Sequence, residues 1–254
     1  METNYGNLCS WFYDIDKPFP PKEELDFYLS FANKNMDILE PMCGSGRILI
    51  EFAKREFNID GFDLSNDMIE RCYKKLGKAM PNCNIICCDF AQYNSDKKYN
   101  LIYIPSCSFS LILYKNEILN SLNKLKTLMT IDGKVILPVL TIETAINNDF
   151  FSNGENKLVK TVREKDFRID FIKINSIYNE NENIFYSKTS YELYVSEKLV
   201  KSENEPFNIK CYNMDEMEKY IKSLGLKIKG KYCDYIKTQY TGQKAEMLIY
   251  EITY

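Results

Sequence analysis

Residues 37–47 read Asp-Ile-Leu-Glu-Pro-Met-Cys-Gly-Ser-Gly-Arg, a short apolar run followed by a turn that contains two glycines. Glycine lets the backbone bend sharply and approach a ligand without a clash from a Cβ atom. The pattern predicts a strand over 36–39 and a helix over 47–57, whose first free N–H groups would face that ligand. The stretch therefore predicts a binding turn between a strand and a helix.

Two acids follow at the ends of the next two predicted strands. Asp63 ends a strand over 58–63, and Asp89 follows a strand over 84–88. The carboxyl ends of parallel strands meet at one edge of an α/β sheet, where ligands bind. An acid at the end of the second strand can accept hydrogen bonds from both hydroxyls of a ribose. Each acid alone is also compatible with a helix cap or a solvated loop.

Strands and helices continue to alternate up to residue 140. We expect helices over 66–76 and 117–129, and strands over 100–104 and 134–140. A last helix, with Asn213 as its N-cap and Glu216 as the capping-box partner, ends at Gly225. Two more strands follow, over 226–235 and 246–252. This alternation predicts an α/β fold, a mostly parallel sheet with helices on both faces.

The alternation stops between residues 141 and 212, where we find no amphipathic helix. We expect three extended runs, over 166–178, 184–195 and 199–212. Apolar residues at Phe167, Ile169 and Phe171 have the period of two that is typical of a half-buried antiparallel strand. We interpret 141–212 as an inserted antiparallel β-meander that covers the site, forms a dimer surface, or does both.

The composition limits the chemistry. The 254 residues include no histidine, which excludes Ser-His and Cys-His mechanisms and His-ligated metals. The net charge of −3 argues against broad binding to nucleic acid backbones. The nine cysteines include a cluster of Cys83, Cys87 and Cys88 without Cys-x-x-Cys spacing. We therefore expect reduced, buried thiols and no metal site.

The start of the chain looks like an entry segment. Met1–Ser10 has no basic region followed by an apolar core, so we expect no secretory signal and a cytoplasmic protein. No apolar stretch approaches the roughly 20 residues that cross a bilayer. Aromatic residues are followed by Pro21, which suits the first turn of a helix. We interpret residues 1–36 as an aromatic and helical lid segment.

These motifs resemble those of class I S-adenosylmethionine-dependent methyltransferases. Residues 40–46 resemble the first motif, 62–68 the second and 88–90 the third, and Asp132-Gly133 fits the pattern before the fifth strand. The resemblance covers about 36–140 and 213–254. It implies a Rossmann-like seven-stranded sheet over 37–140 and 213–254, S-adenosylmethionine as the cofactor and S-adenosylhomocysteine as the product.

The resemblance also implies a role for each matching residue. Glu40 would hold the methionine ammonium, Asp63 the ribose hydroxyls and Asp89 the adenine amino group. Gly44 and Gly46 would pass close to the cofactor. The remaining cofactor-binding residues implied by the resemblance are Met42, Leu64, Met68, Phe90 and Pro105.

The end of the fourth strand bears on the acceptor. Enzymes that methylate adenine or cytosine amino groups carry Asp/Asn-Pro-Pro-Tyr/Phe there, whereas residues 104–109 read Ile-Pro-Ser-Cys-Ser-Phe. With the meander, this segment resembles small-molecule N-methyltransferases of the aminosugar or glycine type. We expect a small, polar, amine-bearing acceptor. The alternatives are an RNA or DNA base methyltransferase, because residues 41–46 resemble some ribosomal RNA enzymes, and a cofactor-binding protein without transferase activity.

Methyl transfer to an amine needs alignment more than it needs a base. Without histidine, a base would be a carboxylate or a tyrosine. Tyr13 is the catalytic candidate, and core or lid packing is its other interpretation. Ser106, Ser108 and Tyr114 also fall near the predicted cleft.

Overall fold

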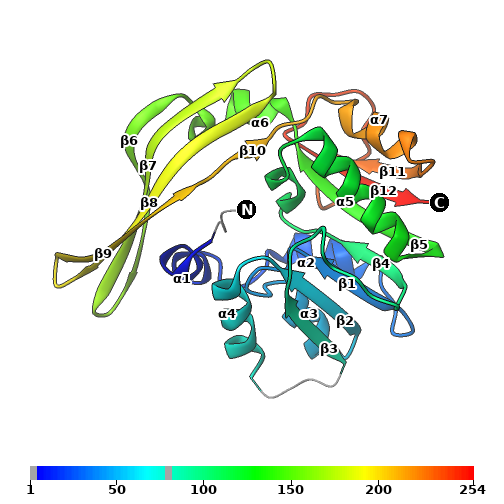
Figure 1. The fold of residues 1–254 in the computed structure, drawn as a ribbon, viewed down its shortest axis with the longest axis horizontal. Helices are drawn as coiled ribbons and strands as arrows, with labels where there is room; N and C mark the ends of the chain where they lie inside the picture. The colour runs from blue at the N-terminus through cyan, green and yellow to red at the C-terminus, as the bar shows by residue number, and fades with distance from the viewer. Residues whose placement is uncertain (1–4, 78–81) are drawn as a thin grey trace.

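The computed structural model describes residues 5–77 and 82–254 and contains two sheets (Figure 1). The larger sheet has seven strands in the order β11-β12-β5-β4-β1-β2-β3. They are β1 (Asp37–Pro41), β2 (Asn58–Asp63), β3 (Cys83–Cys87), β4 (Tyr99–Tyr103), β5 (Met129–Leu140), β11 (Lys227–Tyr232) and β12 (Met247–Thr253). Strands β1 to β5 pair in parallel, and β12 runs antiparallel to both of its neighbours. The predicted Rossmann-like, mostly parallel sheet is confirmed.

Helices cover both faces of this sheet. One face packs against α2 (Lys22–Leu29), α3 (Leu49–Lys54) and α4 (Asn66–Leu76), and the other against α5 (Lys115–Leu128) and α7 (Glu216–Ser223). Successive strand residues therefore enter different cores: Ile38 joins the first and Leu39 the second. Strands that are buried on both faces read as continuous apolar runs. This is why central strands such as β1 and β4 could be located from the sequence.

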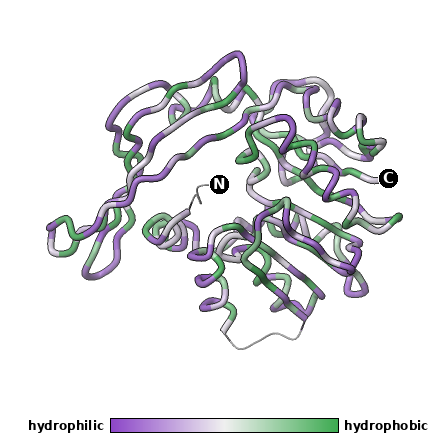
Figure 2. Tube along the Cα trace, in the orientation of Figure 1, coloured by the Kyte–Doolittle hydropathy of each residue, from purple (hydrophilic) through white to green (hydrophobic). Residues whose placement is uncertain are grey.

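The smaller sheet is an antiparallel meander that projects from the end of β5. Its strands are β6 (Gly154–Glu164), β7 (Phe167–Asn179), β8 (Ile184–Val195), β9 (Lys198–Pro206) and β10 (Ile209–Lys210). β7 pairs with β6 and β8, while β8 pairs with β9 along one part and with β10 along another. Figure 2 shows hydrophilic residues interrupting hydrophobic ones along these strands. The chain leaves the larger sheet at Thr141 and returns at Tyr212, and these two residues form a parallel bridge.

A helix that the sequence pattern did not indicate lies between the two sheets. α1 (Asn7–Asp16) contacts α4 on one side and the meander on the other (Figure 1). Its apolar residues Leu8 and Phe12 pack with Ile169 and Tyr191 of the meander. The entry segment is therefore a structural bridge. Residues 1–4 of the predicted lid segment lie outside the described residues.

Several element boundaries differ from expectation. The 141–212 region also contains α6 (Ile142–Asn147) and β6, which the sequence pattern did not indicate, and the 3-10 helix η2 (Asp149–Phe151). Most β6 residues are exposed, so the strand has no apolar alternation to detect. The run predicted over 199–212 divides into β9 and β10.

Two helices begin elsewhere than predicted. α3 covers Leu49–Lys54 and is shorter than the predicted 47–57. α7 has Asp215 as its N-cap, and the prediction of Asn213 was wrong. The carboxylate of Glu216 still accepts from the Asn213 N–H at 3.2 Å, so half of the predicted capping box is formed.

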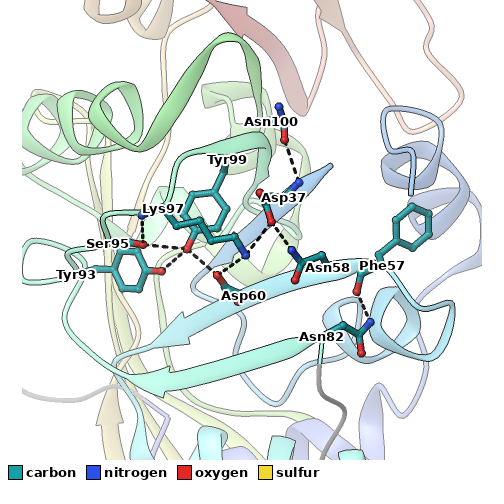
Figure 3. A network of polar contacts seen from close by, with 10 residues as sticks. All are labelled: Asp37, Phe57, Asn58, Asp60, Asn82, Tyr93, Ser95, Lys97, Tyr99 and Asn100. Carbon is teal, nitrogen blue, oxygen red and sulfur yellow. Dashed lines mark hydrogen bonds and ion pairs between the residues drawn. The ribbon is translucent and has the colours of Figure 1, made fainter. Parts of the chain in front are cut away.

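A polar network holds the amino-terminal edge of the larger sheet (Figure 3). Lys97 Nζ lies 3.0 Å from Asp37 of β1 and 3.1 Å from Asp60 of β2. The Tyr99 hydroxyl of β4 donates to Asp60 at 2.8 Å and lies 2.8 Å from the Tyr93 hydroxyl. Three neighbouring strands are thus tied together at the edge opposite to the predicted binding site.

Candidate functional site

Glu40 lies near the carboxyl end of β1, and only 1% of its surface is exposed. Its Oε2 atom has no hydrogen-bond partner among the described residues. Burial raises the pKa of this carboxyl to about 8; Tyr103 and Arg47 lower it, and Glu24 raises it. The buried Tyr103 hydroxyl likewise has no hydrogen-bond partner among the described residues. A buried polar atom without a partner is costly, so this Glu40 oxygen fits a cationic ligand group.

Asp63, at the end of β2, joins the glycine turn to the next loop. Its Oδ2 accepts from the Gly44 N–H at 2.8 Å, and its Oδ1 accepts from the Ser65 N–H at 2.9 Å. Burial raises the pKa of Asp63, and these two N–H donors lower it. A carboxylate oxygen has more than one acceptor position. Both oxygens can therefore accept a further bond from a ligand hydroxyl.

The two glycines of the turn have different surroundings. Gly44 has φ +53°, and an added Cβ would meet only Met68 Sδ, at 3.9 Å. Gly46 has φ +77°, and its Cβ would lie 2.3 Å from Cys72 Sγ and 3.1 Å from Ile50. Gly44 therefore adjoins open space, as a ligand contact requires. Packing of α4 is by itself sufficient to explain Gly46, whose contact with the cofactor stays a prediction.

The residues predicted around an adenine lie after β2 and β3. Leu64 is 37% exposed and Met68 is 3% exposed. The Phe90 ring lies edge-on to Phe62, with centroids 5.4 Å apart. The Asp89 carboxylate accepts from the N–H of the residue two positions later at 2.8 Å. Met42, in the glycine turn after β1, packs on the same hydrophobic core as Phe90.

The turn after β4 is held by an acid that sequence reasoning missed. Ser106 and Cys107 both have left-handed backbones, with φ of 57° and 56°. The N–H and Oγ of Ser106 each donate to Glu24 Oε1 at 3.1 Å. Arg47 donates to Glu24 Oε2 at 2.9 Å, and the Tyr235 hydroxyl donates to Oε1 at 3.1 Å. Glu24 therefore joins segments that are far apart in the sequence.

Two tyrosines of the entry segment lie near Asp63 and Arg47. Burial raises the pKa of both the Tyr13 and Tyr5 hydroxyls. Arg47 partly opposes the rise in the pKa of Tyr13, whereas the nearby Asp63 raises the pKa of Tyr5 further. Their rings meet edge to face with centroids 6.5 Å apart. A raised pKa disfavours Tyr13 as a base at neutral pH, and its catalytic role stays a prediction.

The remaining candidates have ordinary surroundings. The carbonyl of Pro105 accepts from both the N–H and the Oγ of Ser108, at 3.0 and 2.9 Å. Tyr114 is 52% exposed. Cys87 is exposed, which corrects the expectation that the thiols are buried. Within the described ranges, no cluster of acidic and cysteine side chains is arranged to hold a metal ion, and no helix is long and apolar enough to cross a membrane.

Comparison with known sequences identifies a domain in the first half of the chain. A family described as a methyltransferase domain matches residues 38–133. Malonyl-[acyl-carrier protein] O-methyltransferase 1 of Ilyobacter polytropus is 34% identical over 115 residues, 44% of this chain and 41% of the relative. The second such enzyme of that organism is 32% identical over 105 residues, 40% and 39% of the two chains. The chain thus spans about two fifths of these curated relatives.

Solved structures match over nearly the whole chain. An S-adenosylmethionine-dependent methyltransferase from Clostridium acetobutylicum has a TM-score of 0.75 at 17% identity and covers 96% of both chains. The CcbJ methyltransferase of Streptomyces caelestis has a TM-score of 0.77 at 15% identity, over 100% and 98%. The sugar N-methyltransferase KedS8 of Streptoalloteichus has a TM-score of 0.73 at 10% identity, over 98% and 94%. At these identities the likeness establishes a shared fold, which extends over the meander.

Proposed function

We propose that this chain, whose residues 38–133 match a methyltransferase domain and whose fold is shared with methyltransferases, is a class I methyltransferase that methylates a small, polar, amine-bearing acceptor. The supporting observation is the unpartnered carboxyl oxygen of Glu40 beside the glycine turn. S-adenosylmethionine would supply a methyl group that is bonded to a positively charged sulfur. A lone pair of the acceptor would take the methyl carbon in line with the carbon–sulfur bond, with S-adenosylhomocysteine as the leaving group. The ammonium group of S-adenosylmethionine suits Glu40.

The other residues of the site fit the same cofactor. Asp63 has acceptor positions for the two ribose hydroxyls, and the space beside Gly44 is open. Leu64, Met68 and Phe90 supply apolar surface for the adenine ring, and Asp89 supplies an acceptor for its amino group. Met42 and Pro105 complete this proposed set.

The chain's own part in the reaction is alignment and exclusion of water. Tyr5 and Tyr13 flank the cofactor edge, and Glu24 holds the turn after β4 in place. Orientation of this kind can supply roughly 7–11 kcal/mol of a barrier. An amine reaches the site with a free lone pair once it is deprotonated in solution, so the reaction proceeds without a histidine base.

Calorimetric titration with S-adenosylhomocysteine tests the cofactor assignment. We expect micromolar affinity and a higher melting temperature, because ligand at 100 times its Kd adds about 2.7 kcal/mol to stability. Glu40→Gln should bind more weakly, and Glu155→Ala, an exposed position on β6, serves as the matched control. An unchanged melting temperature at millimolar ligand would contradict the assignment of S-adenosylmethionine as the cofactor.

The class of acceptor requires a separate assay. The relatives in sequence are named for malonyl-[acyl-carrier protein], and KedS8 is named for sugars. The net charge of −3 and the meander beside the site favour a small molecule over nucleic acid. We expect labelled methyl transfer to amino sugars or amino acids. Methyl transfer into a malonyl thioester, or into total RNA or DNA at low salt, would show that the acceptor belongs to that class and not to the small amines.

We also propose that two copies associate through the outer face of the meander. This face is opposite to α1 and includes Leu158, Ile172 and Ser190, which pair across β6, β7 and β8. An open groove of about 530 Å³ runs along it. Leu158 is 55% exposed and Ile177 is 61% exposed. Exposed apolar side chains on one sheet face favour association.

A further inference from the structure

α1 begins without a capping side chain of its own. Its N-cap is Gly6, and its first turn has no acid. Two glutamates of β9 take this role instead. The N–H groups of Tyr5 and Gly6 donate to Glu205 at 2.8 and 2.6 Å, and the Leu8 N–H donates to Glu203 at 2.7 Å. Hydrogen bonds from free helical N–H groups to carboxylates are charge-assisted and are favoured by the helix dipole.

α1 and Tyr5, which lies just before it, are both bonded to the proposed cofactor site. The Ser65 hydroxyl donates to the Tyr5 carbonyl at 2.7 Å, and the Ser65 N–H donates to Asp63. Farther along α1, Asp14 accepts from the hydroxyl of Ser45, which belongs to the glycine turn, at 2.6 Å. α1 therefore connects the β9 glutamates to the residues proposed to hold the ribose and the methionine.

Gly6 is matched to this arrangement. Its φ is −66°, which any residue can adopt, so backbone conformation does not require glycine there. A Cβ atom would lie 2.7 Å from Glu205 Oε1, closer than such atoms approach in proteins. The absence of a side chain at Gly6 thus permits the carboxylate to reach the helix.

We propose that Glu203 and Glu205 are positioning residues of the cofactor site. By capping α1 from the meander, they hold Tyr5 and Tyr13 beside Asp63 and Arg47. Cofactor affinity thereby depends on a sheet that supplies none of the proposed cofactor-binding residues. The inference rests on the proposed cofactor and adds a role for the meander besides covering the acceptor.

The test uses two readouts on the full chain, affinity for S-adenosylhomocysteine and acrylamide quenching of Trp11. Trp11 is the single tryptophan of the chain, and its ring packs on Phe167 of the meander with centroids 4.5 Å apart, so its fluorescence reports whether α1 is docked. In the E203A/E205A double variant we expect affinity to fall at least tenfold and quenching to increase. E203Q/E205Q keeps a carbonyl oxygen at each position and should recover most of both.

G6A provides an independent perturbation, because it displaces the Glu205 carboxylate while keeping both glutamates. We expect it to reproduce the loss of affinity, whereas E155A, on the exposed part of β6, should match the wild type. Wild-type affinity in folded E203A/E205A and G6A would overturn the inference, as would a lowered melting temperature with unchanged affinity. If the wild type itself fails to bind, the proposed function falls, and the quenching data still decide whether the glutamates hold α1.

Discussion

Glu40 keeps its proton at a pH where most carboxyl groups have lost it, because burial raises its pKa to about 8. Between the ordinary value of 4.5 and about 8, the folded chain holds a proton that the unfolded chain releases. The ligand-free protein therefore loses stability as the pH rises through this window, by at most about 1.4 kcal/mol per unit. A bound ammonium group would compensate for the negative charge that Glu40 gains when it loses its proton.

Cofactor affinity should consequently depend on pH. Binding an ammonium next to Glu40 lowers the pKa of its carboxyl, so a proton is released on binding below about pH 8. We expect the affinity for S-adenosylhomocysteine to rise between pH 6 and 8, by up to about tenfold per unit. Calorimetry in two buffers of different ionisation enthalpy measures the released proton. Glu40→Gln should show a flat profile, and a flat profile in the wild type would contradict the assignment.

Asp63 should contribute to both binding and stability. The sequence alone predicts that Asp63→Ala weakens cofactor binding more than tenfold without unfolding the protein. The structure adds a cost, because the N–H groups of Gly44 and Ser65 lose their acceptor. We expect the free energy of unfolding to fall by about 1–3 kcal/mol. Urea titration and calorimetry measure the two effects, and Asp63→Asn, which keeps one acceptor, should lie between alanine and the wild type.

The candidate cofactor residues could be found from sequence because each lies at the end of a recognisable strand or soon after it. Glu24 could not, because its bonds to Ser106 and Tyr235 span 82 and 211 positions. Nothing in the local pattern at Glu24 indicates these partners. Contacts that depend on how distant segments meet become visible only in three dimensions.

At the scale of elements, buried strands could be predicted from the sequence more readily than exposed ones. β1 and β4 lie between two layers of helices and read as apolar runs, whereas β6 is mostly exposed and was not located. α1 was missed because it lacks the usual capping signals, its N–H groups being capped by β9. An element stabilised by a distant partner leaves little trace in its own sequence.

The network at the amino-terminal edge should affect stability without affecting binding. Lys97→Met removes the cation between Asp37 and Asp60 and keeps the aliphatic part of the side chain. We expect the free energy of unfolding in urea to fall by about 1–3 kcal/mol, because two carboxylates lose their charged partner and keep only the neutral donors Asn58 and Tyr99. The affinity for S-adenosylhomocysteine should stay within about twofold.

Lys54→Met is the matched control for that variant. Lys54 pairs with Glu51 on the surface of α3, and its side chain is 51% exposed. Exposed pairs of this kind contribute about 0–1 kcal/mol. A Lys97 variant that is as stable as the Lys54 variant would show that the network does not hold the edge together.

At the scale of the whole molecule, the proposed dimer can be tested by light scattering after size exclusion. Ile177→Lys places a charge on the outer face of the meander, where the wild-type side chain is 61% exposed. We expect the wild type to be a dimer and this variant a monomer at tens of micromolar. Ile236→Lys changes an exposed residue of the larger domain (69%) and should remain dimeric. A monomeric wild type would rule out this surface as the dimer interface.

The overall architecture was the most predictable property of the chain. The alternation of strands and helices in the larger domain and the presence of an antiparallel insertion followed from periodicity, and the seven-stranded sheet followed from the resemblance of the motifs. The placement of the insertion against α1 did not. It depends on side chains such as Phe12 and Tyr191, whose apolar character is compatible with many partners.

The bridge between Thr141 and Tyr212 has a consequence for the history of such chains. Because the two ends of the insertion are neighbours, recombination can exchange everything between them while the register of the larger sheet is preserved. Lineages could thus diversify the insertion while the rest of the chain stays under constant selection. Chimaeras joined at these two residues, with insertions taken from the structural neighbours, offer a direct way to retrace that divergence.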